Sequence, residues 1–228
     1  MTSPRILMVL TSHDQMGNTG EKTGFWLEEF ASPYYVFVDA GAKITLASIR
    51  GGLPPVDPKS NLPEWETETT HRFKADMESN KKLQNTLAIA ELNEENYDAI
   101  FLPGGHGPMW DFAQSRTLAN LIKTFDEKKK VISAVCHAPA ALVAVKTDNN
   151  VPLVKGRQLT SFTDSEERTM GLEQVVPFLL ETRLRELGAD FKKSEDFQSF
   201  IVRDSNLITG QNPASSIAAA EEVLNALN

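Results

Sequence analysis

Residues 131–139 read VISAVCHAP, and this stretch decides the fold. The run 131–135 is almost wholly apolar, as expected of a strand that is buried on both faces of a sheet. Small residues and Pro139 follow it, and a proline here favours the first turn of a helix. The stretch therefore predicts a strand, a sharp turn at Cys136 and a helix, which is the building unit of an α/β sheet.

The same alternation of apolar strands and helices extends along the chain in both directions. It predicts an α/β fold with a doubly wound, mostly parallel sheet flanked by helices. Residues 1–228 are expected to form a single domain, with an elaborated connection at about 51–92, where prolines interrupt the pattern. Strands are expected at 6–10, 43–49, 98–102, 131–135 and 159–162, with a hairpin of 200–202 and 207–209. Helices are expected at 25–40 with a break or kink at Pro33, and at 73–90, 117–128, 175–187 and 212–227.

Composition narrows the function classes. The chain has 228 residues and a formal net charge of −8. A polyanion would be repelled by this charge, so nucleic acid is not an expected partner. One cysteine cannot form an intrachain disulfide, which fits a reducing compartment. Because no apolar stretch has the length of a membrane span and no secretory signal is recognisable, we expect a cytoplasmic protein without membrane contact.

Cys136 is the first candidate for chemistry. It directly follows a buried strand, and ligands of such sheets bind beyond the carboxyl ends of the strands. Amides at the start of the next helix would favour the thiolate, which is the reactive form. The amide of His137 could also bind an oxyanion. The alternative is a buried structural cysteine, but the turn position and the adjacent histidine favour a nucleophile.

Residues 103–107 read PGGHG and follow another expected strand. Glycines let backbone amides approach a ligand closely, so Gly105 is a candidate for a second oxyanion donor. His106 is either a ligand contact or a turn residue, and the pattern alone does not decide between them. The segment lacks the glycine spacing of a dinucleotide fingerprint.

Two groups of carboxylates accompany these motifs. In the first expected helix Glu29 shares a face with Trp26, and a carboxyl among aromatic side chains has a raised pKa and can act as a general acid or base. Glu28 is expected to be an ordinary solvated charge. Residues 161–167 read SFTDSEE, and any of the three carboxylates there could orient His137.

Other catalytic classes lack their signatures. The sequence has no paired-cysteine motif and no His-x-x-x-His spacing, so we expect no metal. The Gly-x-Ser-x-Gly elbow of serine hydrolases is also missing. A cysteine and a carboxyl can carry out acid–base and covalent chemistry by themselves, so no cofactor is expected.

Taken together, these motifs resemble the ThiJ/PfpI superfamily, whose fold is that of class I glutamine amidotransferases. More narrowly, they resemble the heat-shock glyoxalase III branch found in yeasts and bacteria. The chain departs from the family at Ala138, where glycine is usual, and it has no match to the His-x-Glu pair of true glutamine amidotransferases. The segments that carry the resemblance run in order across almost the whole chain: 24–33 with Glu29, 104–107, 134–139, 162–167 and 209–215.

The resemblance implies a flavodoxin-like sheet with extra elements and a homodimer. It implies Cys136 as the nucleophile, with His137 beside it. Glu29 matches the carboxyl that hydrogen-bonds this cysteine in the family. Glu167 best matches the acidic third member of the triad, and Asp164 is the alternative.

The activity that the resemblance implies is that of a glutathione-independent glyoxalase, which converts methylglyoxal and related 2-oxoaldehydes to 2-hydroxy acids. Cys136 would form a hemithioacetal with the aldehyde, and Glu29 would move a proton between the two carbons. Gly105, His106 and Trp26 are the expected contacts to this small substrate. Two alternatives stay open: a stress-response holdase or protein deglycase with a redox-sensitive cysteine, and a cysteine amidase or peptidase.

Overall fold

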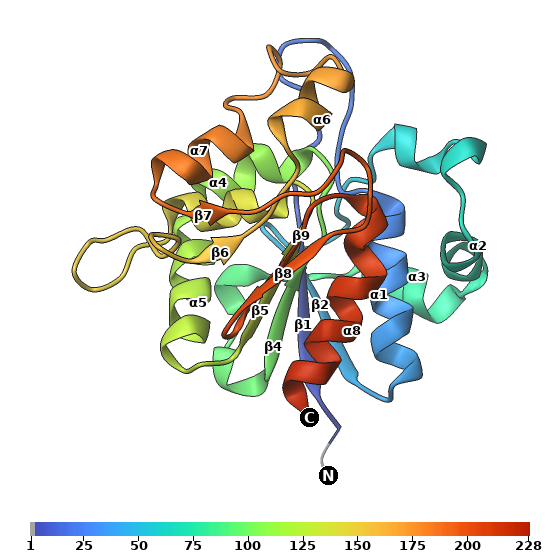
Figure 1. The fold of residues 1–228 in the computed structure, drawn as a ribbon. Coiled ribbons are helices and arrows are strands. Elements are labelled where there is room, and N and C mark those ends of the chain that lie inside the picture. Colours follow the sequence, from blue (N-terminus) through green and yellow to red (C-terminus); the bar gives the residue numbers. More distant parts are fainter. Residues whose placement is uncertain (1–2) are drawn as a thin grey trace.

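A seven-stranded sheet runs through the centre of residues 3–228, the part of the chain that the computed structural model describes (Figure 1). Its strand order is β3-β2-β1-β4-β5-β9-β8, and all neighbours pair in parallel except β8 and β9. The expected mostly parallel, flavodoxin-like α/β sheet is thus confirmed, as is the antiparallel hairpin. The strands are β1 Arg5–Leu10, β2 Lys43–Ser48, β3 Leu87–Ala88, β4 Ala99–Leu102, β5 Val131–Val135, β6 Gln158–Leu159, β7 Asp190–Phe191, β8 Ile201–Asp204 and β9 Leu207–Gly210.

Helices cover both faces of this sheet. In Figure 1, α1 and α8 lie side by side on one face, and α4 and α5 lie on the other. The α-helices are α1 Leu27–Asp39, α2 Glu68–Ala75, α3 Met77–Gln84, α4 Asp111–Gln114, α5 Arg116–Glu127, α6 Asp164–Thr169, α7 Leu180–Glu186 and α8 Ser216–Leu227. Short 3₁₀ helices lie at Pro58–Asn61, Pro63–Trp65, Ile89–Glu91, Glu94–Asn96, Gly107–Met109, Ala138–Ala144 and Pro213–Ser215. None of the helices in residues 3–228 combines the length and the apolar character that a membrane crossing requires.

The apolar run of β1 fills both halves of the core. Ile6, Met8 and Leu10 pack on the side of α1 and α8, whereas Leu7 and Val9 point to the side of α5. All five side chains are fully buried. Because side chains alternate across a strand, a central parallel strand needs apolar residues at every position, and this explains the continuous run.

The connection between β2 and β4 differs from the single helix expected at 73–90. It contains α2 and α3, which are separated at Asp76, followed by the edge strand β3. The Asp76 side chain accepts hydrogen bonds from the backbone N–H groups of Glu78 and Ser79 and so begins a new helix. A side chain that competes in this way for backbone donors ends one helix and caps the next.

Prolines explain two further differences. The helix expected at 175–187 begins only at Leu180, because Pro177 lacks an N–H group and disfavours helical geometry at the residue before it. Pro33, in contrast, lies inside α1 without interrupting it. Of the break or kink expected there, the break is therefore wrong, and the kink stays a prediction.

The strand expected at 159–162 is also shorter than predicted and does not join the main sheet. β6 ends at Leu159 and pairs with β7 in a separate two-stranded sheet. Thr160 then donates its N–H to the Thr209 side chain, and Phe162 donates its N–H to the carbonyl oxygen of Cys136. The backbone donors of this segment therefore fix it against the turn at Cys136.

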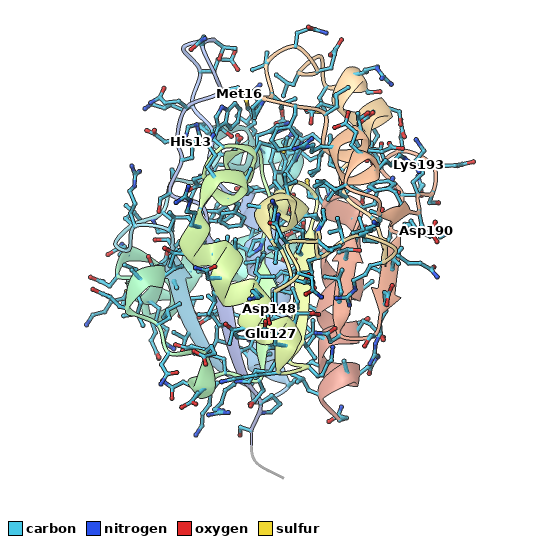
Figure 2. All side chains as sticks on the ribbon, turned by 90° about the vertical axis from the view of Figure 1, so that its left-hand side faces the viewer. His13, Met16, Glu127, Asp148, Asp190 and Lys193 are labelled. Atoms are coloured by element: carbon cyan, nitrogen blue, oxygen red, sulfur yellow. The ribbon has the colours of Figure 1, made fainter. Side chains whose placement is uncertain are left out.

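The carboxyl ends of the parallel strands meet at one edge of the sheet, the upper edge in Figures 1 and 2. The loop after β1, in which His13 and Met16 are labelled in Figure 2, rises at this end, and α6 lies above the sheet here in Figure 1. Glu127, at the end of α5, lies well below it in Figure 2. Segments far apart in the sequence thus converge around the end of β5.

Candidate active site

Cys136 occupies a strained turn directly after β5. Its φ of 59° lies in the left-handed region, which costs a residue with a side chain about 1–2 kcal/mol. Two hydrogen bonds hold the turn: the Cys136 N–H donates to Gly210 at 2.9 Å, and the Cys136 carbonyl accepts from Phe162 at 2.8 Å. The side chain is only 3% exposed. The surrounding structure therefore holds a single thiol in a conformation that it would not adopt alone.

The state of this thiol differs from the sequence-based expectation. The segment after Cys136 is a 3₁₀ helix, Ala138–Ala144, rather than an α-helix. Burial raises the pKa of the Cys136 thiol well above its ordinary value, and the charge of Glu29 adds to the shift. The Gly105 N–H donates to the sulfur and acts in the opposite direction. The expected lowering of the thiol pKa by helix amides is therefore wrong, because burial outweighs it.

Glu29 lies in the first turn of α1 with no exposed surface. Its Oε2 accepts the Gly104 N–H at 2.9 Å. Its Oε1 is buried and has no hydrogen-bond partner within residues 3–228. Burial raises the pKa of Glu29 well above the ordinary value, and the charge of Glu28 adds to this. The hydrogen bonds of Glu29 to the Gly104 N–H and to the Cys136 side chain act in the opposite direction but do not outweigh burial, so the protonated form is favoured.

Glu29 and Cys136 form one coupled titrating pair. The charge and the hydrogen bond of Glu29 raise the pKa of the Cys136 thiol, whereas the hydrogen bond of Cys136 lowers the pKa of Glu29. The protons of such a pair leave in two steps that belong to the pair rather than to either group. The first ionisation therefore leaves one negative charge shared between sulfur and carboxyl, with one proton still held there.

Two histidines share the carboxylate of Glu167. His137 Nε2 lies 2.7 Å from Glu167 Oε2, and His106 Nε2 lies 2.9 Å from Glu167 Oε1. The pKa of Glu167 is held well below its ordinary value, because the hydrogen bonds and the electrostatic attraction of the two histidines outweigh burial. An ionised carboxylate only accepts hydrogen bonds, so both Nε2 atoms carry the hydrogen.

In this tautomer His137 can accept a proton from the nucleophile. With hydrogen on Nε2, the Nδ1 atom of His137 carries a free lone pair, and it lies 3.2 Å from the Cys136 sulfur. Burial lowers the pKa of His137, and the charge of His106 adds to the effect, so the ring starts neutral. A neutral imidazole in contact with a thiol is the arrangement of a general base beside a nucleophile.

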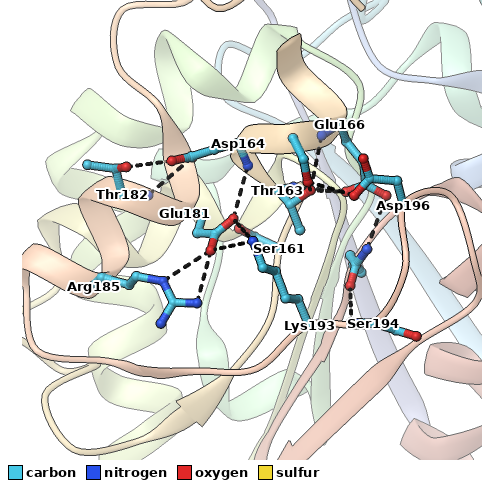
Figure 3. Close-up of polar contacts among 12 residues, drawn as sticks. Ser161, Thr163, Asp164, Glu166, Glu181, Thr182, Arg185, Lys193, Ser194 and Asp196 are labelled. Atoms are coloured by element: carbon cyan, nitrogen blue, oxygen red, sulfur yellow. Dashed lines mark hydrogen bonds and ion pairs between the residues drawn. The ribbon is translucent and has the colours of Figure 1, made fainter. Parts of the chain in front are cut away.

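Helix α6 places Glu167, and its start is fixed by a capping box. The Thr163 side chain accepts the Glu166 N–H, and the Glu166 carboxylate accepts the Thr163 N–H (Figure 3). Asp164, the alternative third residue, instead contacts the Thr182 N–H and hydroxyl, as Figure 3 shows. Glu167 rather than Asp164 therefore contacts His137.

Glycine is required at positions 104 and 105 because the backbone there lies very close to neighbouring residues. A Cβ on Gly104 would lie 2.5 Å from Glu29 Oε2 and 2.9 Å from Cys136 Cβ. A Cβ on Gly105, whose φ is 91°, would lie 2.5 Å from the backbone nitrogen of Trp26. Since real contacts are longer than this, only glycine lets the loop after β4 touch both α1 and the nucleophile.

The side chains enclose a cavity of about 70 Å³. Six of the seven predicted site residues line it, and Glu167 lies behind the two histidines. Sequence reasoning did not identify the apolar members of the lining, because single aromatic and methionine residues in loops carry no recognisable pattern. Only Phe162 and Pro213 lie within segments already singled out. These additional residues are Trp65, Phe162, Met170, Phe197 and Pro213.

Glu28 departs from the expectation of a solvated charge. It is half-buried, and burial raises its pKa to about 7, against weaker opposing hydrogen bonds from Ser32 and Ser216. Its Oε2 accepts the Ser216 hydroxyl at 3.4 Å, which ties α1 to α8. Of the two consecutive glutamates of α1, Glu29 is therefore fully shielded from water and Glu28 partly so.

One group within residues 3–228 has the composition of a metal site. His106, His137 and Glu167 each offer a ligand atom, and these atoms lie within 4.8 Å of one another. The same atoms already satisfy one another by hydrogen bonds. The arrangement is accounted for without an ion, and the absence of a metal stays a prediction.

Several known proteins are similar to this chain in sequence and fold. A solved structure, the Rapid Encystment Protein 24 kDa of Francisella tularensis, superposes with a TM-score of 0.95 at 39% identity and covers 99% of both chains. Glyoxalase 3 of Candida albicans is 31% identical, over 96% of this chain and 97% of its own. The crystal structure of glyoxalase III from the same yeast has a TM-score of 0.90 and covers 98% of this chain and 97% of its own. The family model described as the DJ-1/PfpI family matches residues 22–226. The chain thus belongs to the DJ-1/PfpI family.

Proposed function

We propose that the protein is a glutathione-independent glyoxalase that converts methylglyoxal and related 2-oxoaldehydes to 2-hydroxy acids. The observation that carries the proposal is Glu29, a fully buried carboxyl that lines the same small cavity as Cys136 and whose Oε1 has no hydrogen-bond partner within residues 3–228. A simple thiol hydrolase needs a cysteine and a histidine. A carboxyl of raised pKa beside the sulfur adds what an internal proton shift requires, a group that both takes and returns a proton.

The first step would attach the aldehyde to Cys136. The sulfur, whose proton passes to His137 Nδ1 or stays shared with Glu29, attacks the aldehyde carbon and forms a C–S bond. The carbonyl π electrons move to oxygen, where the N–H groups of Gly105 and His137 stabilise the charge. The oxygen then takes the proton and completes a hemithioacetal. Glu167 holds His137 in the tautomer that this step needs.

The second step would move hydrogen from one carbon to its neighbour. Once the sulfur is bonded to carbon and its proton is on the hemithioacetal oxygen, the negative charge of the pair lies on Glu29, which takes the proton from the former aldehyde carbon. The electrons form an enediolate, and the hydroxyl proton passes from the first oxygen to the second. Glu29 then returns its proton to the adjacent carbon. The product is the thioester of a 2-hydroxy acid, with the same atoms as the hemithioacetal. Water then cleaves the thioester and releases the acid and the thiol.

The remaining predicted contacts fit this scheme. His106 and Trp26 line the cavity beside the thiol and would contact the substrate. The curated relative from Candida albicans carries the name glyoxalase, which supports a small aldehyde as substrate. We also infer a homodimer and a cytoplasmic location, as the family resemblance and the single cysteine imply.

The test measures D-lactate released from methylglyoxal without glutathione. We expect the wild type to form D-lactate and Cys136→Ala to form none above background, because no other thiol exists in the chain. Circular dichroism and thermal unfolding check that the variant is folded. A folded Cys136→Ala variant with near wild-type kcat, or a wild type that turns over no 2-oxoaldehyde, would overturn the proposal.

A further inference from the structure

Three large apolar side chains surround the mouth of the cavity and remain in contact with water. Trp65 is 47% exposed, Phe197 41% and Met170 39%, and all three line the cavity that contains Cys136. We call these three residues the apolar rim. They come from separate segments of the chain, so their gathering is a product of the fold. Exposed apolar residues that gather at a cavity mark a binding surface.

Phe197 is held in this position against its backbone preference. Its φ is 59°, a left-handed conformation that is rare for a bulky residue. Its N–H donates to Glu166 Oε1 at 2.7 Å. The chain thus keeps a strained residue in place while its ring gains little burial. Strain of this kind, when the surroundings maintain it, is typical of ligand-binding sites.

Glu166 is the anchor of that arrangement. It is fully buried, and its carboxylate accepts five hydrogen bonds. Thr163 provides two of them at the start of α6, and the side chains of Gln211 and Asn212 provide two more from the segment after β9. The fifth comes from Phe197. Glu166 therefore joins three segments of the chain. It fixes Phe197 of the apolar rim beside α6, the helix that also carries Glu167.

The rim continues as an apolar wall down to the catalytic groups. The Phe197 ring meets Phe162 at 6.2 Å between centroids, and Phe162 lies over His137 at 4.3 Å. The polar groups of the cavity thus gather at its floor, around Cys136 and Glu29. A substrate whose reactive end is polar and whose other end is apolar matches this division.

We propose that the apolar rim is a subsite for the substituent R of a 2-oxoaldehyde R–CO–CHO and that it favours an aromatic or branched alkyl group over methyl. The inference rests on the proposed function, because the aldehyde must reach Cys136 for the substituent to lie at the rim. Methylglyoxal would leave the rim in contact with water, whereas a phenyl group would cover it. Phe197 is then a specificity-determining residue.

The experiment compares kcat/KM for phenylglyoxal and methylglyoxal. Because the two aldehydes differ in intrinsic reactivity, the decisive quantity is the change in their ratio between variants. We expect Phe197→Ala to lower kcat/KM for phenylglyoxal more than that for methylglyoxal, so that their ratio falls about 10-fold, the usual effect of losing such an apolar contact. Phe197→Leu, which keeps apolar bulk, should retain most of the ratio.

Two further variants separate recognition from folding. Phe197→Gly removes the ring without adding strain, since glycine accepts a left-handed backbone, and it should change the ratio as Phe197→Ala does. Met77→Ala removes a side chain that is 85% exposed and lies outside the cavity lining, and it should leave the ratio unchanged.

The outcomes distinguish this proposal from the one on which it rests. A constant ratio in both ring-deleting variants, with methylglyoxal still turned over, would overturn the subsite and leave the glyoxalase assignment standing. No hydroxy acid from either aldehyde in the wild type would overturn both proposals. A selective loss of phenylglyoxal turnover supports both.

Discussion

Two pairs of consecutive glutamates flank the nucleophile, Glu28–Glu29 on α1 and Glu166–Glu167 on α6. The pKa values of Glu29 and Glu167, one from each pair, are shifted in opposite directions. Glu29 accepts one backbone N–H, and its pKa is raised by burial. Glu167 is almost as buried, yet the two histidine side chains hold its pKa well below the ordinary value. The difference shows that donors and charges around a buried carboxyl, rather than burial alone, decide whether it holds a proton.

The same contrast separates the roles that we propose. A group that must take and return a proton needs a pKa closer to the working pH, whereas a group that orients a histidine must stay ionised. In this scheme Glu29, from the α1 pair, carries the proton. Glu167, from the α6 pair, stays ionised. Exchanging acid for amide in each pair tests this division.

The largest effect is expected at Glu29. Glu29→Gln keeps the shape and can still accept the Gly104 N–H, but it cannot carry a proton, so kcat should fall at least about 10²-fold. Glu28→Gln is the matched control one residue away and should change kcat less than about threefold. Steady-state D-lactate release measures both. Equal losses in the two variants would remove the distinction between the glutamates of α1.

A smaller effect is expected at Glu167, which would orient rather than react. In Glu167→Gln the amide has one acceptor oxygen and an NH₂ group, so it cannot accept from both histidines in their present tautomers. We expect kcat to fall about 10-fold. Asp164→Asn, three residues earlier, should have little effect, because that side chain contacts Thr182. A larger loss at Asp164 than at Glu167 would contradict the assignment.

Much of this arrangement could be predicted from the sequence, since it depends on strong local patterns. The run 131–135 and the turn at Cys136 follow from apolar periodicity and small residues. Glu29 is indicated by its place beside aromatic residues on one helix face together with the family resemblance. In contrast, the break at Asp76 depends on a single capping side chain, and β6 ends early because Thr160 and Phe162 find backbone and side-chain partners elsewhere. Such competition between partners is not encoded in local periodicity.

The protonation and solvent exposure of the site residues are harder to predict from the sequence than their identity. The thiol pKa depends on the balance between burial and a few donors, and this balance needs three-dimensional distances. Glu28 was expected to be solvated because helix phase alone places it away from Glu29. The packing of α8, through Ser216, shields it instead. The apolar rim, likewise, is assembled from residues that are adjacent only in the fold.

The smallest effect, and the one that tests the shielding of Glu28 directly, is the pH dependence of stability. The pKa of Glu28 rises from 4.5 to about 7 in the folded protein, so between these values the folded state holds a proton that the unfolded state has lost. The contribution of Glu28 to the free energy of unfolding is fully present below about pH 4.5 and is lost as pH rises through 7. The loss is at most on the order of 3 kcal/mol. Glu28→Gln should therefore gain stability relative to wild type between pH 4.5 and pH 8, measured by urea unfolding. Glu222→Gln is the control with the opposite sign, because Arg203 lowers the pKa of Glu222. Parallel pH profiles for wild type and Glu28→Gln would show that Glu28 is solvated after all.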